Sequence, residues 1–502
     1  MRGIQSYIFL FCAGLLCINA FGQTESTLYF MNSIPQVVEA NPAIFPRYKT
    51  SIGLPVISSV GSVYTNNGFA FGDVISNADG TSKVDLSKLT SRMTNNNYVQ
   101  FAAQTDLFRI GLRINPKMYV MASSTLKAYE RTMIPLGLVS LAVDGTVPII
   151  GSYSQSSPSV EGSALLVTSM GLGYQVNDRL TIGGRLKYII GQMNVTTDAS
   201  SLLVQVNDVY QITATGSASV RSSGLYNLTK AGYSPADHWS DYLKNNGWGF
   251  DLGATYKATD KLTLGASLTD IGFVTWRNNT YQYTLDPAKA TYTFSGIDIS
   301  KLANNNTNYL TGQLDSIKNK FQATELATGS YTTYLPGKLF LSGKYDILDN
   351  LSVGLLFFNE KYKERLSSGV TAAVNKNFGK WVSTYLSYTA SNRSYNNIGL
   401  GVSFNVAPVQ IYFVGDNLFG AATSMVSNGN LNSYLNNAQI VTVRAGLNIV
   451  MGWDKGNTRK DVKGPSGIPR SKTSNSVMKT TVGGNPNSGS PKGRKRRPPP
   501  TK

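Results

Sequence analysis

Tyr174-Gln-Val-Asn-Asp178-Arg-Leu180-Thr-Ile-Gly183 is one of three versions of a ten-residue pattern that decides the fold. The other two are Tyr256-Lys-Ala-Thr-Asp260-Lys-Leu262-Thr-Leu-Gly265 and Tyr345-Asp-Ile-Leu-Asp349-Asn-Leu351-Ser-Val-Gly354. In each version an aromatic residue closes one strand, Asp and its basic or amide neighbour suit a tight turn, and the last four residues restart an apolar–polar alternation. A chain that reuses one hairpin builds a large antiparallel sheet, and the Asp residues are predicted to serve as turn residues.

Composition indicates which kind of sheet this is. The chain has 502 residues, of which 41% are hydrophobic and only 15% charged, with 48 Gly and 28 Tyr. A soluble domain averages roughly 25% charged residues. Beyond the first few dozen positions, however, no apolar run reaches the roughly 18 residues of a spanning helix. Low charge without such a run is typical of a membrane β-barrel, whose strands alternate their hydrophobicity.

The N-terminus predicts secretion. Arg2 supplies a positive start, residues 8–18 form an apolar core, and small residues flank a cleavage site after Gly22. Both cysteines, Cys12 and Cys17, lie inside this segment, so the mature chain should contain none. With His238 as the sole histidine, we expect no structural zinc, no disulfide, no cofactor and no Cys- or His-centred catalysis, and therefore no enzyme.

Alternation predicts the two faces of the wall. In residues 248–257, Trp, Phe, Leu, Ala and Tyr occupy one face, while Gly, Asp, Gly, Thr and Lys occupy the other. The charged residues Arg185, Lys187 and Asp251 fall on polar faces, where they would be prohibitive in lipid but ordinary in a wet lumen. We expect these three side chains to face the interior of a barrel.

A soluble β-sandwich also alternates, and connection lengths argue against it. The Asp-centred turns are short, whereas residues 192–247 and 272–337 form long connections, which is the pattern of short periplasmic turns and long external loops. Strand starts are predicted near Tyr98, Leu107, Met118, Ser163, Leu180, Trp248, Leu262, Lys338, Leu351, Arg365, Trp381, Ile398, Val409 and Ile440. The prediction is an all-β, transmembrane antiparallel β-barrel of about 14 strands in the outer membrane, with both termini periplasmic. The run Lys49–Ser58 is either a further strand or part of a plug.

The segment before the barrel carries a local motif. Pro35, Pro42 and Pro46 exclude a strand or a long helix there. The motif Asn41-Pro42-Ala43 resembles the inserted hatch of fatty-acid-transporter-type (FadL-like) barrels and of secretion-associated Bacteroidota barrels of the PorV and PorP/SprF types. Further landmarks, among them Ile52-Gly-Leu-Pro55 and Thr269-Asp-Ile-Gly-Phe273, are similar to an uncharacterised Bacteroidota outer-membrane barrel family. The resemblance implies fold and location more than activity.

The predicted domains are a signal peptide (1–22), a hatch (23–47), a barrel (48–453) and a disordered basic periplasmic tail (454–502). The tail holds thirteen Lys and Arg against two Asp, so most of the chain's net charge of +18 is local to it. It is either a solvated spacer or a tether to a periplasmic anionic partner through its basic end, and secretion excludes nucleic acid. That basic end comprises Lys492, Arg494, Lys495, Arg496 and Arg497.

Two classes of function agree with these patterns. The first is a non-enzymatic accessory or anchoring subunit of an outer-membrane protein assembly or secretion machine, with outer-membrane lipid and other envelope proteins as partners. The alternative is a FadL-like passive channel for a hydrophobic or small solute, gated by the hatch motif Asn41, Pro42 and Ala43. A docking role predicts a lumen blocked by plug and side chains. A channel predicts a continuous path, or a lateral opening where strand pairing breaks.

Overall fold

The computed structural model shows a closed antiparallel barrel of 14 strands. The structure describes residues 26–67, 75–78, 81–84, 86–226, 239–294, 307–363, 365–391, 394–417 and 440–453. All of these belong to one compact unit that ends at Lys455. The predicted signal peptide and the predicted basic tail lie outside the described residues.

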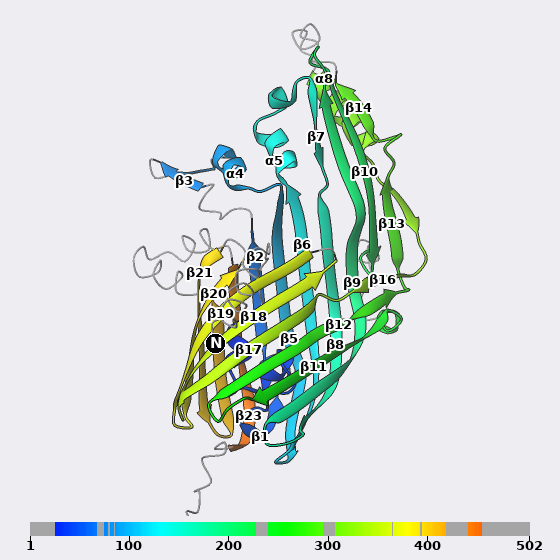
Figure 1. Ribbon diagram of the computed structural model, residues 1–502. Coiled ribbons are helices and arrows are strands. Elements are labelled where there is room, and N and C mark those ends of the chain that lie inside the picture. Colours follow the sequence, from blue (N-terminus) through cyan, green and yellow to red (C-terminus); the bar gives the residue numbers. More distant parts are fainter. Residues whose placement is uncertain are drawn as a thin grey trace, which may run out of the picture. The chain divides into compact units, whose positions relative to one another are not determined.

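The wall begins with a strand in two parts, which also closes the barrel. Both parts pair with the second strand on one side and with the last strand on the other, so that Ile52 lies opposite Ile110 and Ile449. In chain order the wall is β1 (Tyr48–Gly53) with β2 (Val60–Asn66), β5 (Asn96–Asn115), β6 (Met118–Pro135), β8 (Ser159–Gln175), β9 (Leu180–Val206), β11 (Asn246–Lys257), β12 (Leu262–Trp276), β17 (Gly337–Leu348), β18 (Leu351–Tyr362), β19 (Arg365–Phe378), β20 (Val382–Ser391), β21 (Ser394–Val406), β22 (Val409–Asp416) and β23 (Ile440–Trp453) (Figure 1).

The predicted strand count is confirmed, but its division of the first strands is wrong. Tyr98 and Leu107 lie in one strand, β5, and the run from Lys49 supplies β1. A bulge between Asp106 and Phe108 shifts the pairing with β6 by one residue. Because a bulge inserts one extra residue, apolar residues that alternate at odd positions before it alternate at even positions after it, or the reverse. One long strand with a bulge therefore has the sequence pattern of two shorter strands.

The connections differ between the two rims of the barrel. One rim carries tight hairpins, among them the three repeats, and also holds the ends of β1 and β23, where Tyr48 pairs with Trp453. At the other rim the connections over residues 192–247 and 272–337 are long, as predicted, but large parts of them form strands instead of irregular loops. β9 is 27 residues long and pairs beyond the barrel with other strands. We call this extension the tower; it comprises the outer part of β9, β7 (Ser152–Ser156), β10 (Ile212–Ser223), β13 (Thr280–Leu285), β14 (Thr291–Phe294), β15 (Thr324–Ala327) and β16 (Tyr331–Tyr334).

Short helices and one small hairpin accompany these sheets. Within the described residues, none of the helices combines the length and apolar character needed to cross a bilayer. The helices on the tower side are α5 (Leu136–Val143), η2 (Val147–Ile149), α6 (Trp239–Tyr242) and α8 (Thr307–Lys320). The small hairpin consists of β3 (Ile75–Ala78) and β4 (Thr81–Val84), and α4 (Leu86–Arg92) follows it in the chain.

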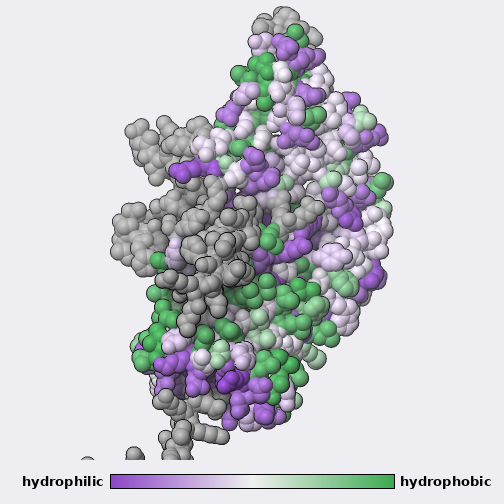
Figure 2. Space-filling view, in the orientation of Figure 1, coloured by the Kyte–Doolittle hydropathy of each residue, from purple (hydrophilic) through white to green (hydrophobic). Residues whose placement is uncertain are grey.

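The two faces of the wall have opposite chemistry. On β11, Trp248, Phe250 and Leu252 are 49%, 43% and 52% exposed, whereas Asp251 is fully buried. Since successive residues of a strand point to opposite faces, the exposed apolar set lies outside and the polar set inside. Figure 2 shows apolar side chains gathered over the barrel, with hydrophilic ones toward the hairpin rim and toward the tower. An apolar belt with a polar interior is the arrangement of a membrane barrel.

Residues 26–47, which we call the hatch, fill the interior. They include α2 (Ser26–Phe30) and the 3-10 helix η1 (Pro35–Glu39), whose side chains are mostly buried. α2 packs against β18, β19, β20, β21 and β22. Other hatch residues contact each of the remaining wall strands. On β17, β12, β11 and β9 these contacts are Tyr29 with Ser342, Ala40 with Ser267, Asn41 with Ala254 and Pro42 with Gly183. On the strands that complete the wall they are Phe45 with Gly173 of β8, Val37 with Tyr119 of β6, Glu39 with Arg109 of β5 and Arg444 of β23, and Gln36 with Ser58 between β1 and β2.

The closing glycine of each repeated hairpin is a seat for the hatch. A Cβ built on Gly183 would lie 2.3 Å from the carbonyl oxygen of Pro42, and one on Gly354 would lie 2.3 Å from the Phe30 ring. A Cβ on Gly265 would lie 2.8 Å from the Tyr29 hydroxyl. These glycines are therefore inward positions at which any side chain would occupy the space of the hatch.

Gly183→Ala should destabilise the protein, whereas Gly184→Ala should not. The first substitution forces a methyl group against hatch backbone, and overpacking of this kind costs about 1–3 kcal/mol. The second faces outward, where the nearest atoms are 3.7 Å away. Denaturant unfolding in detergent micelles, followed by tryptophan fluorescence, measures both. Equal midpoints for the two variants would show that the hatch is not seated on Gly183.

Candidate functional site: the plugged lumen and two cavities

The motif Asn41-Pro42-Ala43 lies in the lumen against β9, β11 and β12. The Asn41 side chain is fully buried, and its Oδ1 accepts the Ala43 backbone N–H at 2.9 Å. Its Nδ2 donates to the Tyr29 hydroxyl at 3.1 Å and points at the carbonyl of Ala266 at 3.4 Å. The amide thus fixes the turn of the motif and ties it to the wall.

Glu39 is the ionic anchor of the hatch, a role that no pattern in the sequence around it indicates. Its carboxylate pairs with Arg444 at 2.9 Å and with Arg109, which in turn holds Asp106 at 2.8 Å. All four side chains are buried. Burial by itself would raise the pKa of Glu39, but Arg444 and Arg109 outweigh it and hold that pKa well below its ordinary value. Glu39 is therefore ionised at any physiological pH.

The three charged residues predicted to face the lumen lie together. Asp251 pairs with Lys187 at 2.5 Å and with Arg185 at 3.2 Å, and all three side chains are buried. Lys187 also pairs with Asp270 at 2.5 Å. Asp270 lies within 3.6 Å of Lys127 and 3.9 Å of Lys338. The predicted trio is thus part of a larger network that adds Lys127, Asp270 and Lys338.

A further ion pair crosses the lumen beyond this network. Arg131 on β6 pairs with Glu360 on β18 at 3.0 Å and donates to the Gln100 side chain at 2.7 Å. Its guanidinium also lies over the ring of Tyr362, 5.2 Å from the centroid. Because β6 and β18 are not neighbours in the wall, this pair bridges the interior.

These side chains line a lumenal cavity of about 110 Å³. Its lining comes from β2, β5, β6, β8, β12, β17, β18 and β23 and combines apolar surface with several charged side chains. The charged members are Lys127, Arg131, Asp270, Lys338, Glu360 and Arg444.

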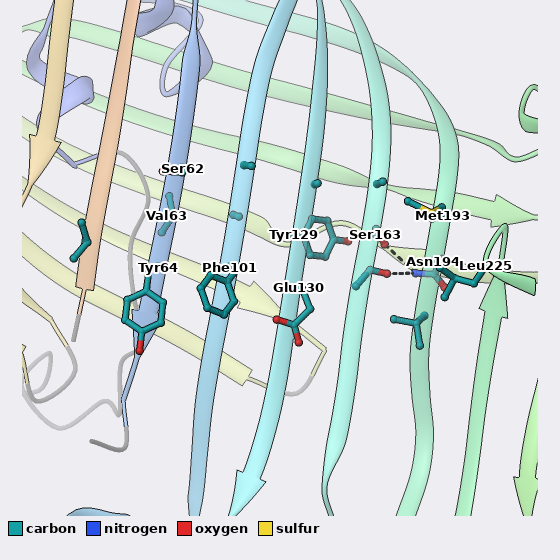
Figure 3. Close-up of a pocket in the computed structure, with 17 residues that line it drawn as sticks. Ser62, Val63, Tyr64, Phe101, Tyr129, Glu130, Ser163, Met193, Asn194 and Leu225 are labelled. Carbon is teal, nitrogen blue, oxygen red and sulfur yellow. Dashed lines mark hydrogen bonds between the residues drawn. The ribbon is translucent and has the colours of Figure 1, made fainter. Parts of the chain in front are cut away.

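A second and larger cavity of about 980 Å³ lies against the same part of the wall. Tyr64, Phe101 and Glu130 stand in a row on β2, β5 and β6 (Figure 3). Phe101 is 53% exposed, and its ring centroid lies 5.2 Å from that of Tyr64. The neighbouring residue Gln100 accepts a hydrogen bond from Arg131 inside the lumen. Because successive residues of a strand point to opposite faces, this row lies on the outer face of the wall. We call this cavity the outer groove. Its floor consists of small residues: Ser62, Ala103, Ala128, Gly162 and Ala164.

The predicted partner-binding end of the tail is not placed, because Lys492, Arg494, Lys495, Arg496 and Arg497 lie outside the described residues. The same holds for His238, for which no catalytic role is predicted. In the part of the chain that the structure describes, no group of three or more His, Cys, Asp or Glu is arranged to hold a metal ion.

This geometry is that of a closed β-barrel with an internal hatch. The chain belongs to the family described as "Family of unknown function (DUF5723)", whose model matches residues 42–416. No curated protein matches the chain. The predicted relation to Bacteroidota barrels of the PorV and PorP/SprF types stays a prediction.

Three solved structures to which the chain is similar are described as two toluene transporters and a FadL homologue. The Ralstonia pickettii toluene transporter TbuX is 10% identical with a TM-score of 0.41, covering 87% of this chain and 100% of that one. The Pseudomonas putida toluene transporter TodX is 12% identical with a TM-score of 0.37 (86% and 95% covered). A Pseudomonas aeruginosa FadL homologue is 11% identical with a TM-score of 0.37 (86% and 98% covered).

Glu39→Gln should loosen the hatch in a pH-dependent way. Removing one partner of a buried ion pair costs about 3–5 kcal/mol, because Arg109 and Arg444 keep their charge. Since the pKa of Glu39 is depressed in the folded protein, its stabilisation is complete above the ordinary value of 4.5, decreases as pH falls below that value, and is gone once pH has fallen through the depressed value. Unfolding midpoints of wild type and variant, measured from pH 7 downward, should differ by a constant amount down to about pH 5 and converge progressively below pH 4.5. Midpoints that already converge above pH 5 would contradict the paired, ionised Glu39.

Proposed function

We propose that this chain is an outer-membrane barrel that its own hatch keeps closed, and that it anchors other envelope proteins instead of forming an open pore. Lipid tolerates only closed ladders, because unpaired strand edges cannot be hydrated there. The apolar belt and the closure of β1 and β2 on β23 meet that demand. Short hairpins mark the periplasmic rim of such barrels, so the proposal places the ends of β1 and β23 in the periplasm.

Closure is supported by the extent of hatch contacts. The hatch reaches every strand of the wall, and its Glu39 anchor joins β5 to β23. Displacing the hatch means breaking a buried ion-pair group as well as its apolar packing, and breaking one such pair alone costs about 3–5 kcal/mol. A displaced hatch is therefore rarely populated without an outside force or partner.

The docking role is supported mainly by the tower. β9 has 27 residues, roughly 90 Å at ~3.3 Å per residue, whereas a tilted membrane strand needs about 9–11 residues. Much of this strand thus stands outside the bilayer, where it builds a sheet with β7 and β10.

Apolar side chains are exposed at the end of this sheet. Val147, Tyr153, Val209 and Tyr210, which we call the tip, are 73%, 60%, 77% and 69% exposed. They lie at one end because β7 pairs with the last residues of β9, directly before the turn to β10. Large exposed apolar groups in water mark interaction surfaces.

The double variant Val209→Ser, Tyr210→Ser should lose a protein partner that the wild type retains. The tip supplies apolar area for docking, and its polar version should not change the barrel, from which these residues are remote. Intact cells are cross-linked, the tagged barrel is purified in detergent, and stoichiometric partners are identified by mass spectrometry. Leu326→Ser is the control, since Leu326 is 61% exposed on β15, which pairs with β13 away from the tip. Absence of a stoichiometric partner, or its equal loss with the control, would overturn the docking role.

A second candidate function, a channel for a hydrophobic solute, is favoured by the two cavities. The lumenal cavity and the outer groove share Ser62, Val63, Ala102, Ala103, Ala128 and Tyr129 in their linings. They are therefore separated by one layer of wall, in which four of the six shared residues are Ser or Ala. Strand pairing across this layer is continuous, so passage would require the wall to move.

The two functions predict different flux. In liposomes, a closed anchor should pass a fluorescent hydrophobic solute no faster than protein-free vesicles do. A channel should pass it, and Ala128→Trp in the outer groove should then reduce the flux several-fold while Ala390→Trp on β20 should not. Wild-type flux above the protein-free rate with this pattern would replace the anchoring proposal by the channel.

A further inference from the structure

The end of strand β18 makes ionic contacts with strands on the other side of the lumen. Lys363, directly after β18, pairs through its ammonium group with the carboxylate of Glu161 on β8. The same ammonium group donates to Thr196 Oγ1 on β9 at 2.9 Å and to the carbonyl oxygen of Thr197 at 3.1 Å. Since β9, β11, β12 and β17 separate β8 from β18 on the shorter way around the wall, Lys363 bridges the lumen.

Two further contacts lie beside this bridge. The ring of Tyr362 meets the ring of Tyr129 on β6 edge to face, with the two centroids 6.1 Å apart. Tyr362 also lies beneath the guanidinium of Arg131, which pairs with Glu360 at 3.0 Å. Glu360, Tyr362 and Lys363, which we call the latch, thus contact β6, β8 and β9 through two ion pairs and one aromatic pair.

The latch and the hatch lie toward opposite ends of the lumen. The strand β18 begins at Leu351, next to a tight hairpin, and ends at Tyr362 on the tower side. Glu161 and Thr196 are the last pair of β8 with β9, beyond which β9 continues into the tower. The hatch is instead seated on glycines beside the tight hairpins, such as Gly354.

The lumenal cavity lies between these two sets of contacts. Arg131, Glu360 and Tyr362 line it on the side of the latch. Arg444, which binds Glu39 of the hatch, lines it on the other side. The cavity is therefore bounded by the hatch toward the hairpin rim and by the latch toward the tower.

The latch is the weaker of the two closures. The side chain of Lys363 is 44% exposed. Those of Glu39, Arg109 and Arg444 in the hatch anchor are 8%, 4% and 5% exposed. Water and salt screen an exposed ion pair more strongly than a buried one. The contact of Lys363 with Glu161 is therefore easier to break than the anchor of the hatch.

We infer that the latch is a second closure of the lumen, which controls access to the lumenal cavity from the tower side while the hatch stays in place. When Lys363 leaves Glu161, the end of β18 is released from the opposite wall and the cavity opens toward the tower. The inference goes beyond the anchoring role, which requires only the hatch. It holds equally for a barrel that anchors a partner and for one that passes a solute.

The accessibility of a single thiol in the full-length protein, purified in non-ionic detergent, tests the latch. Cys12 and Cys17 lie in the predicted signal peptide, so Ala102→Cys, which lines the lumenal cavity, is the reporter in the mature chain. A small charged methanethiosulfonate reagent modifies this thiol, and mass spectrometry gives the rate. Modification should be slow with the intact latch. Lys363→Gln and Glu161→Gln should each accelerate it roughly tenfold or more, because local opening then costs less free energy.

Salt supplies a second measurement on the same proteins. At about 1 M salt the screening length falls to about 3 Å, so the exposed ion pair of the latch weakens. Modification of the reporter should therefore accelerate with salt when Lys363 is present and should not respond to salt in Lys363→Gln.

Lys361→Gln is the matched control. Lys361 lies on β18 two residues before Lys363 and is exposed on the outer face, so its loss removes the same charge without touching the latch. The double variant Glu161→Lys, Lys363→Glu should restore slow modification, which a general loosening of the barrel would not do. Circular dichroism confirms the fold of each variant, and Lys363→Gln stands in should Glu161→Gln fail to fold.

Three outcomes would overturn the latch. The first is fast modification of the reporter when the latch is intact. The second is an equal rate with the intact latch and in the folded Lys363→Gln and Glu161→Gln variants. The third is an acceleration by Lys361→Gln as large as that by Lys363→Gln. Glu39→Gln loosens only the hatch, so its effect on the rate should add to that of Lys363→Gln and separates failure of the hatch from failure of the latch.

Discussion

The interior of a fourteen-stranded barrel is too wide for its own wall to fill, and this constraint shapes the rest of the molecule. About eight strands suffice for side chains to meet across the centre, while about sixteen leave a water-filled channel. Here the space is taken by the hatch, whose side chains reach every wall strand. The inward face is accordingly rich in Gly, Ser, Thr and Asn, which leave room for a separate segment and bond to it.

Buried ion pairs, in addition to the hatch, hold strands of the wall together across the lumen. Glu39 joins the hatch to β5 and β23, and Arg131 joins β6 to β18. The contacts of Asp251 and Asp270 with Arg185, Lys187, Lys127 and Lys338 join β6, β9, β11, β12 and β17. These groups lie in a lumen that the apolar belt surrounds, so each charge needs a partner at close range. The balance of charges is therefore a structural property of the barrel as much as a functional one.

The sequence predicts what depends on local periodicity. Alternation identifies the inward position of Asp251 and the turns of the repeats, because both follow from a period of two. It fails at Asp106, where a bulge changes the phase, and in the tower, where Thr- and Ser-rich strands lack an apolar face. Glu39 could not be matched to Arg444, 405 residues away, because that pairing depends on closure of the whole barrel. Asn41 was found only through a family resemblance.

The ion pair between Glu39 in the hatch and Arg444 in the last strand has a consequence for biogenesis. The hatch is the first part of the described chain to be synthesised, yet β23, which supplies Arg444, is the last. The hatch therefore cannot complete its contacts until the last strand is in place. Folding of the interior and closure of the wall become one cooperative event, so an incomplete chain lacks both a sealed edge and a filled centre. An assembly machine could therefore distinguish a finished barrel from an unfinished one by its closed wall alone.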